Sequence, residues 1–321
     1  MTGIFFAQGW LLLALLAGIV FVNGWTDAPN AVATCVASGA MPMRRAINMA
    51  AVFNFLGLLA VLPFGAAVGD EISAAVPRNE NALTVLCAAM ISVVAFAVFA
   101  WYFGVPTSES HALVSALSGA AAAAGAGITK SLWISVFLGI LITSGAGFIL
   151  GLGFKRAMDR SGLYKQKRAL KKTEILCAAL LSLIHGAQDG QKFSALIILT
   201  LSLSAGREIN GAAATLFCAL LLGAGTAVGG ARIIKKVGNG ITVVDEGGGV
   251  CCDAAAFVSI LVCTVFGMPV STTHTKTSAI LGVGAAGKRV NLKAFSEIFS
   301  LWLLTFPVCF GLGYVIARLC I

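Results

Sequence analysis

Charged residues are scarce in this chain of 321 residues, since only 11% are Asp, Glu, Lys or Arg while 59% are hydrophobic. Apolar segments of about 20 residues, long enough to cross a bilayer as helices, recur from one end of the sequence to the other. The scarcity of charge excludes a soluble domain. The composition is typical of an all-α integral membrane protein.

Signatures of secretion and of disulfide or metal frameworks are also missing. The apolar run at residues 5–22 follows no basic segment and precedes no A-x-A-like cleavage site, so we expect a first membrane span and not a signal peptide. The nine cysteines show no C-x-x-C ligand spacing, and several, such as Cys87 and Cys218, lie inside apolar runs. We therefore expect them to act as small hydrophobic residues.

Motifs of membrane enzymes and ATPases are absent as well. The sequence has no H-E-x-x-H or Asp-rich metal motif. The segment "GVGAAGKR" (282–289) ends in Arg289 where a phosphate-binding loop needs Ser or Thr. We predict that the chain is not an enzyme; an intramembrane lipid-phosphate enzyme is the weaker alternative.

The hydrophobic pattern predicts about ten spans together with broken helices. The breaks are expected near residues 24–30, 104–110, 186–192 and 267–273, where Gly, Pro and polar residues interrupt the apolar runs. The expected spans are 4–23, 46–69, 82–103, 111–128, 131–152, 175–204, 210–230, 250–266, 274–287 and 294–317.

Basic residues indicate orientation. The net charge of +9 arises from Lys and Arg in loops between the spans, which suits anionic lipid headgroups better than nucleic acid. Most of these residues, including those of "KRAMDRSGLYKQKRALKK" (155–172), fall on one side of the predicted spans. The positive-inside rule predicts a multi-pass cell-membrane protein with both termini outside and the loop 155–172 inside.

Two pairs of motifs recur in the halves of the chain. "NGWTDAPN" (23–30) matches "HGAQDGQK" (185–192), and "FGVPTSESHALVSALSG" (103–119) matches "FGMPVSTTHTKTSAILG" (266–282). Five spans before the second copy reverse its direction, so we expect two inverted-topology repeats with a central site, as in secondary transporters. The predicted division is 1–154 for the first repeat, 155–173 for a basic cytoplasmic linker and 174–321 for the second repeat.

The first motif pair predicts a coupling-ion site. Asp27 and Asp189 fall at membrane depth, where an ionised carboxylate must hold a cation or take up a proton. Pro29 and nearby glycines indicate unwound backbone with free carbonyls, which suits cation binding. The coupling-ion candidates are Asp27, Asp189, Asn23, Thr26 and Gln188.

The second motif pair predicts an anion site. Pro106 and Pro269 end one helix, and a Ser/Thr-rich turn then begins the next, where free N–H groups and hydroxyls bind oxyanions. Ordinary N-capping is the alternative for Ser108 or Ser271. The substrate-binding candidates are Ser108, Ser110, Ser271, Thr272, Thr273, Asn30, Gln191 and Lys192. The supporting candidates are His111, His185, His274, Ser115 and Ser278.

Three further charges are assigned separately. We expect Lys192 to pair with Asp189, three residues before it, and Lys276 to snorkel towards the membrane interface. Glu109 has no acidic counterpart at Thr272, so it is either a proton-linked group or an outward-facing surface residue.

These segments, with "MAAVFNFLG" and "GTAVGGARII", resemble the inorganic phosphate transporter (PiT) family over nearly the whole chain. The resemblance implies phosphate uptake driven by a sodium or proton gradient, an inverted-repeat fold with re-entrant hairpins, and a homodimer. Asp27, Asn30 and Asp189 match the family's ion and phosphate motifs. The Ser and Thr residues of the two turns match its hydroxyl-rich hairpins.

Two departures bear on the coupling ion. The family's Asn-Asp pair is Thr26-Asp27 here and Gln188-Asp189 in the second copy, while residues 190–192 are more similar to proton-coupled bacterial members. We therefore expect a phosphate symporter that uses H⁺ or Na⁺, with no cofactor and no certain metal site. A permease for another oxyanion such as sulfate is the alternative, and a passive channel is disfavoured by the broken helices.

Overall fold

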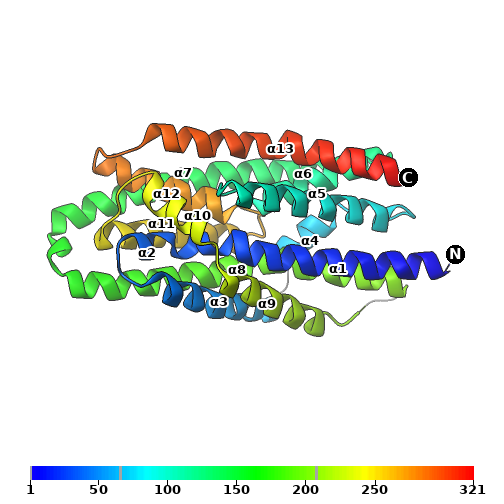
Figure 1. Ribbon diagram of the computed structural model, residues 1–321, viewed down its shortest axis with the longest axis horizontal. Coiled ribbons are helices and arrows are strands. Elements are labelled where there is room, and N and C mark those ends of the chain that lie inside the picture. Colours follow the sequence, from blue (N-terminus) through cyan, green and yellow to red (C-terminus); the bar gives the residue numbers. More distant parts are fainter. Residues whose placement is uncertain (1, 65–66, 207–208) are drawn as a thin grey trace.

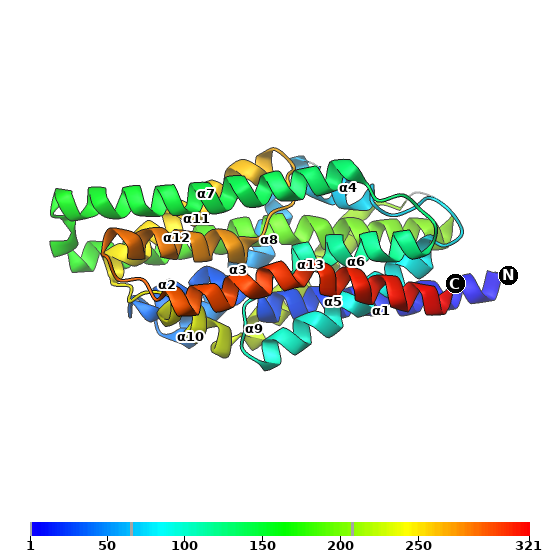
Figure 2. The ribbon, with the colours of Figure 1, turned by 90° about the horizontal axis from the view of Figure 1, so that it is seen from above.

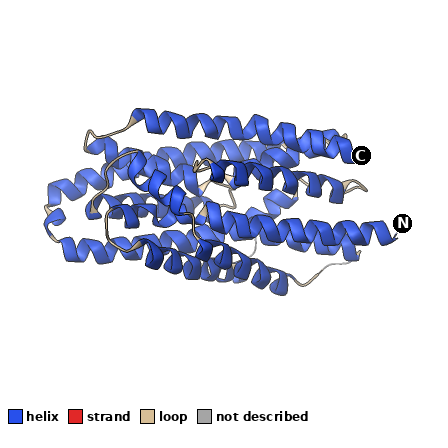
Figure 3. Cartoon of the chain, in the orientation of Figure 1, coloured by secondary structure: helices blue, strands red, loops and turns tan. Residues whose placement is uncertain are grey.

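The computed structural model describes residues 2–64, 67–206 and 209–321, and the regular elements in these ranges are helices (Figure 3). Most helices run along one long axis (Figure 1). Both termini lie at one end of this axis and the turn at residues 162–166 lies at the other, and a view turned by 90° agrees (Figure 2).

The first half contains the helices that precede this turn and carries the first copy of each motif. They are α1 (Thr2–Thr26), η1 (Ala28–Val32), α2 (Ala33–Ala37), α3 (Met43–Ala60), η2 (Leu62–Phe64), α4 (Ala67–Ser73), α5 (Ala82–Tyr102), α6 (Glu109–Ala123) and α7 (Lys130–Ser161).

The second half begins with a 3-10 turn and carries the second copies. Its elements are η3 (Leu163–Lys165), α8 (Lys167–Ala205), α9 (Gly211–Val228), α10 (Ala231–Gly240), α11 (Glu246–Val265), α12 (Thr272–Ala286) and α13 (Leu292–Cys320). The basic segment 155–172 thus comprises the end of α7, η3 and the start of α8, and the predicted division into two repeats and a linker stays a prediction.

Membrane-spanning capacity is confirmed at a coarser level than predicted. In the described part of the chain, 6 helical stretches are long and apolar enough to cross a membrane. They are Gly9–Ala37, Ala82–Tyr102, Lys130–Ser161, Gly211–Val228, Glu246–Val265 and Leu292–Cys320. The chain is therefore an all-helical, multi-pass membrane protein, while about ten spans and inverted repeats stay predictions.

Three of the four expected helix breaks are present. α1 stops at Thr26 and is followed by the 3-10 turn η1, with Pro29 near its start. α5 and α6, and likewise α11 and α12, are joined by non-helical turns that contain Pro106 and Pro269. Both turns lie near the middle of the long axis (Figure 3). Proline causes these breaks, because it lacks the N–H donor that a helix interior requires.

The predicted break at residues 186–192 is wrong, since α8 is a continuous helix of 39 residues. This motif copy has no proline, and glycine alone costs only about 1 kcal/mol in a helix. Gly186 and Gly190 instead allow close packing of α8 on α3. A Cβ atom on Gly186 would clash with the Asn54 backbone, and one on Gly190 would meet the Leu58 side chain at 2.7 Å.

Glycine also sets the other close helix crossings. Gly24 of α1 faces the backbone of α9, and Gly225 of α9 faces that of α1. Gly119 of α6 and Gly313 of α13 are reciprocal in the same way. Small residues allow helix backbones to approach closely where a hydrophobic driving force between helices is weak.

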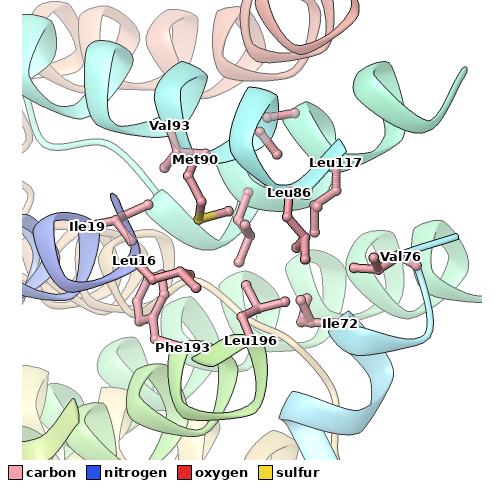
Figure 4. Packing of buried hydrophobic residues seen from close by; sticks show 14 of the residues in the cluster. Leu16, Ile19, Ile72, Val76, Leu86, Met90, Val93, Leu117, Phe193 and Leu196 are labelled. Carbon is pink, nitrogen blue, oxygen red and sulfur yellow. The ribbon is translucent and has the colours of Figure 1, made fainter. Parts of the chain in front are cut away.

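Apolar side chains from α1, α4, α5, α6 and α8 pack together in one buried cluster (Figure 4). Leu16, Met90 and Phe193 are among its fully buried members. On the outer surface, by contrast, Leu141 and Ile149 of α7 are 71% and 66% exposed. Such outward apolar residues suit contact with lipid chains, so this face of α7 is suited to the bilayer. The buried cluster instead surrounds the middle of α8.

Candidate functional site

The broken ends of α1, α6 and α12 meet at the middle of α8. Asn23, near the end of α1, donates a hydrogen bond to Asp189 of α8, with 3.0 Å between Nδ2 and Oδ2. Ser110 at the start of α6 accepts one from Lys192 of α8. Residues from both copies of both motifs therefore share one buried cluster, which we call the central site.

Asp27 lies between the end of α1 and η1 and receives three hydrogen bonds. Asn30 donates from Nδ2 at 2.9 Å, Thr273 donates from its hydroxyl, and Thr272 lies at 3.5 Å. Asn30 also reaches Thr273 Oγ1 at 2.7 Å. Because Asp27 is only 2% exposed, these donors replace the water that an ionised carboxylate requires.

Asp189 pairs with Lys192, which confirms the prediction for this lysine. Nζ lies 2.5 Å from Asp189 Oδ1, also donates to Ser110, and lies 3.5 Å from the Val270 carbonyl oxygen. Both charged side chains are 1% exposed. The ammonium is thus enclosed by oxygen atoms from α8, α6 and the turn before α12.

His185 bridges the two carboxylates. Its Nε2 lies 3.5 Å from Asp189 Oδ2 and 3.9 Å from Asp27 Oδ2, while Nδ1 lies 2.6 Å from Asn54 Oδ1. The ligand atoms of Asp27, His185 and Asp189 lie within 4.8 Å of one another. This group can hold a cation or share a proton, and Lys192 neutralises only one of its two carboxylates.

Glu109 belongs to the same region. It is 1% exposed at the start of α6 and accepts a hydrogen bond from Thr26 at 2.6 Å. Its second carboxylate oxygen has no hydrogen-bond partner among the residues that the structure describes. An outward-facing role is therefore excluded. The Thr26 hydroxyl lies between Glu109 Oε1 and the Val22 carbonyl oxygen of its own helix, and in the described part of the chain it has no hydrogen bond to Asp27 or Asp189.

The two hydroxyl-rich turns use their first serine as a helix cap. Ser108 Oγ accepts from the His111 amide at 3.3 Å, and Ser271 Oγ accepts from the His274 amide at 3.2 Å. Two residues after each capping serine, Ser110 and Thr273 point to the charged groups of the central site. The caps fix the turns so that these hydroxyls face α8 and α1.

The turn histidines lie on the opposite side, against α13. The rings of His111 and His274 meet edge to face at 4.6 Å, and Trp302 stacks on His274 at 3.8 Å. Within the described ranges, neither ring nitrogen of His111 or of His274 has a hydrogen-bond partner. Ser115 donates to the Phe306 carbonyl at 2.5 Å, so the supporting residues of α6 hold α13 in place.

Three candidates lie apart from the charged centre. Gln188 bonds to Thr264 at 2.6 Å and to the Met268 carbonyl at 2.9 Å, which ties α8 to α11. Gln191 lines a separate cavity of about 210 Å³ beside Leu58. Ser278 is buried one turn beyond His274 on α12.

The prediction that Lys276 snorkels towards the membrane interface is wrong. This lysine is 1% exposed and forms an ion pair with Asp253 of α11, so it does not snorkel to the interface. Its Nζ also lies 2.8 Å from Thr34 Oγ1. Sequence reasoning missed Asp253, although a lone acid between apolar residues in "CCDAAAF" was a signal that such a partner exists.

Comparisons with known proteins identify the family of the chain. The model of the phosphate transporter family matches residues 23–176 and 155–313. A probable low-affinity inorganic phosphate transporter of Bacillus subtilis is 34% identical over 306 residues, covering 92% of each chain. One from Rhizobium meliloti is 32% identical over 324 residues, covering 92% of this chain and 94% of the relative.

A solved structure described as "The sodium-dependent phosphate transporter" has the same fold, with a TM-score of 0.72, 19% identity, and coverage of 98% of this chain and 99% of the other. The relatives are transporters, which confirms that the chain is not an enzyme. The motif pairs, the shared fold and the match along the chain lead to one assignment. This protein belongs to the phosphate transporter family.

Proposed function

We propose that the chain is a secondary active symporter that carries inorganic phosphate into the cell, coupled to a cation gradient. The observation that carries this proposal is that the two hydroxyl-rich turns reach the two motif carboxylates. Thr273 of one turn contacts Asp27 directly, and Ser110 of the other contacts Lys192, the ion-pair partner of Asp189. Phosphate needs hydroxyl and cationic donors, and a coupling cation needs carboxylates. One site supplies both.

The proposed coupling ion is the proton. Lys192 places an ammonium among three oxygen atoms, where a transporter without this lysine could hold a metal cation. His185 then stands between Asp27 and Asp189 with Nε2 free of a hydrogen bond, which is suited to receive a proton. Sodium is the second candidate, because these three residues could also ligate a cation.

The packing of the two halves supports alternating access as the proposed transport mechanism. The glycine crossings of α1 on α9 and of α6 on α13 join the two halves of the chain through smooth, close surfaces. Such surfaces support rocking of one half against the other about the central site. The proposed orientation keeps both termini outside and the 155–172 turn inside, with lipid on the exposed apolar faces; a homodimer stays a prediction from the family resemblance.

Sulfate is the alternative substrate, since hydroxyls and ammonium groups bind either oxyanion. The proton on phosphate separates the two anions, because a carboxylate such as Asp27 accepts a hydrogen bond from protonated phosphate but repels sulfate. Excess sulfate should therefore leave phosphate uptake nearly unchanged. Strong competition by sulfate would contradict the phosphate assignment.

The decisive experiment is uptake of labelled phosphate into proteoliposomes under a pH gradient or a sodium gradient. We expect the pH gradient to drive uptake above electrochemical equilibrium, which a channel cannot do. The double variant Asp27→Asn, Asp189→Asn should abolish this uptake, whereas the exposed control Asp70→Asn should not. Uptake driven only by sodium would refute proton coupling, and equal uptake by the double variant would refute the symporter.

A further inference from the structure

A second buried charge cluster lies between the central site and the end of the molecule that carries the 162–166 turn. It contains Glu174 near the start of α8, Asp253 of α11 and Lys276 of α12, which are 0%, 0% and 1% exposed. Neither motif pair includes Glu174 or Asp253. The function proposed above uses none of the three.

A polar stripe connects this cluster to the central site. Asn30 of η1, Thr34 of α2 and Ser38, directly after α2, follow one another at intervals of four residues, about one helical turn. Asn30 contacts Thr273 in the central site. One turn on, Thr34 donates to Asp253 Oδ1 at 2.5 Å, and at the next turn Ser38 lies 2.8 Å from both carboxylate oxygens of Glu174.

The two acids are neighbours across α11. A Cβ atom on Gly249 would clash with the Glu174 carboxyl group, so this carboxyl group occupies the space beside that glycine. Gly249 and Asp253 lie one turn apart on the same side of α11. The charged groups that act on Glu174 are Asp253 and Glu246 of α11 and Lys276 of α12.

Charge balance identifies what the cluster lacks. Lys276 forms its ion pair with Asp253. Among the described residues, Asp253 Oδ2 has no hydrogen-bond partner, and the hydrogen-bond partner of the Glu174 carboxyl group is the neutral Ser38 hydroxyl. A buried carboxylate without a cation costs several kcal/mol, and it avoids that cost by taking up a proton. The cluster thus has two carboxyl groups and one ammonium group. The carboxylate without a cation is a binding site for one proton.

The position of Glu174 suits exchange with water. Lys171, Lys172 and Thr173, just before it on α8, are exposed. Asp189 lies 15 residues further along the same helix, which is about 22 Å at the helical rise. Asn30, Thr34 and Ser38 lie four residues apart along the way, and each contacts a polar group of one of the two clusters.

We propose that Glu174 is the exit site for the coupling proton, a role that rests on the proton symport proposed above. Its carboxylate takes one proton from the protonated central site through the stripe and becomes neutral. The O–H bond then breaks, and the proton passes to water at the end of the molecule beside the 162–166 turn. The carboxylate that is left is ready for the next cycle.

The test separates net transport from exchange in proteoliposomes. Net uptake driven by a pH gradient needs the proton to leave the protein, whereas exchange of labelled for unlabelled phosphate at equal pH does not. Glu174→Gln should reduce net uptake by about tenfold or more while exchange stays within about twofold. Glu174→Asp, which keeps a titratable group, should retain net uptake above that of Glu174→Gln.

The matched control is Glu297→Gln, the same change at an exposed acid of α13, which should leave both activities unchanged. Unchanged net uptake in Glu174→Gln would overturn the proposal. So would parallel loss of exchange and net uptake in both Glu174 variants, which would indicate a structural role. Failure of the proposed proton symport looks different, because the unsubstituted protein would then not accumulate phosphate under a pH gradient, whether or not it exchanges phosphate, and the proton role would fall with it.

Discussion

Thr273 donates a hydrogen bond to the carboxylate of Asp27, although 246 residues separate them in the chain. The contact joins the start of α12 to the break after α1. It therefore links a predicted anion-binding turn directly to a predicted ion-binding carboxylate, so that occupancy of one can change the affinity of the other.

Removal of this hydroxyl should weaken phosphate transport. Thr273→Val deletes a hydrogen bond to a charged group, worth about 1.5–3 kcal/mol, so we expect a fall of roughly 10- to 150-fold in the ratio of maximal uptake rate to apparent KM. The matched control is Thr277→Val, one turn further along α12, where the buried hydroxyl oxygen has no partner. Equal losses in the two variants would show that the Thr273 contact has no special role.

The Lys192–Asp189 pair should dominate local stability. Lys192→Gln and Asp189→Asn each leave one buried charge without its partner, at a cost of about 3–5 kcal/mol. The melting temperature in detergent should drop for each single variant. The drop for the double variant should be well below the sum of the two single drops. Additive losses would contradict direct pairing.

Close packing of α8 on α3 predicts a steric effect at Gly186. Gly186→Ala should lower the melting temperature, because the added Cβ meets the backbone at Asn54. Gly18→Ala in α1 is the control, since a Cβ there meets nothing within 4 Å, and it should be neutral or slightly stabilising through helix propensity. A tolerated Gly186→Ala would show that α3 and α8 can separate without loss.

Native Cys320 offers a test of orientation. It is the exposed one of the nine cysteines and lies at the end of α13, at the same end of the molecule as the N-terminus (Figure 1). With the termini outside, a membrane-impermeant thiol reagent added to intact cells should label Cys320. A cysteine introduced by Tyr164→Cys in a Cys320→Ser background should stay unlabelled until the cells are opened. The reverse pattern would invert the topology.

Sequence patterns predicted the elements that local chemistry controls. The breaks at Pro29, Pro106 and Pro269 are present because proline removes a helix donor wherever the chain goes. Gly186 and Gly190 misled the prediction, since glycine serves equally for an unwound backbone and for a close helix crossing. Only the position of α3 distinguishes these two roles.

The partners of the buried charges show the same limit. Lys192 was assigned correctly because Asp189 lies three residues away on one helix face. Lys276 was assigned wrongly because Asp253 lies on another helix. The sequence leaves the role of Glu109 undecided for the same reason, because its partner Thr26 lies on another helix.

The sequence by itself determined that this is an all-helical membrane protein with two copies of a charged motif and of a hydroxyl-rich turn, since hydropathy and proline act locally. It also determined that every charge at membrane depth needs a partner, because burial of a lone charge is costly. Which partner each charge has was decided only by the tertiary structure. The cost of desolvation requires that each buried charge has a partner, but it does not determine which residue this is. Hydrogen bonds and ion pairs act over a few ångströms, so the partner is set by how helices from distant parts of the chain pack together.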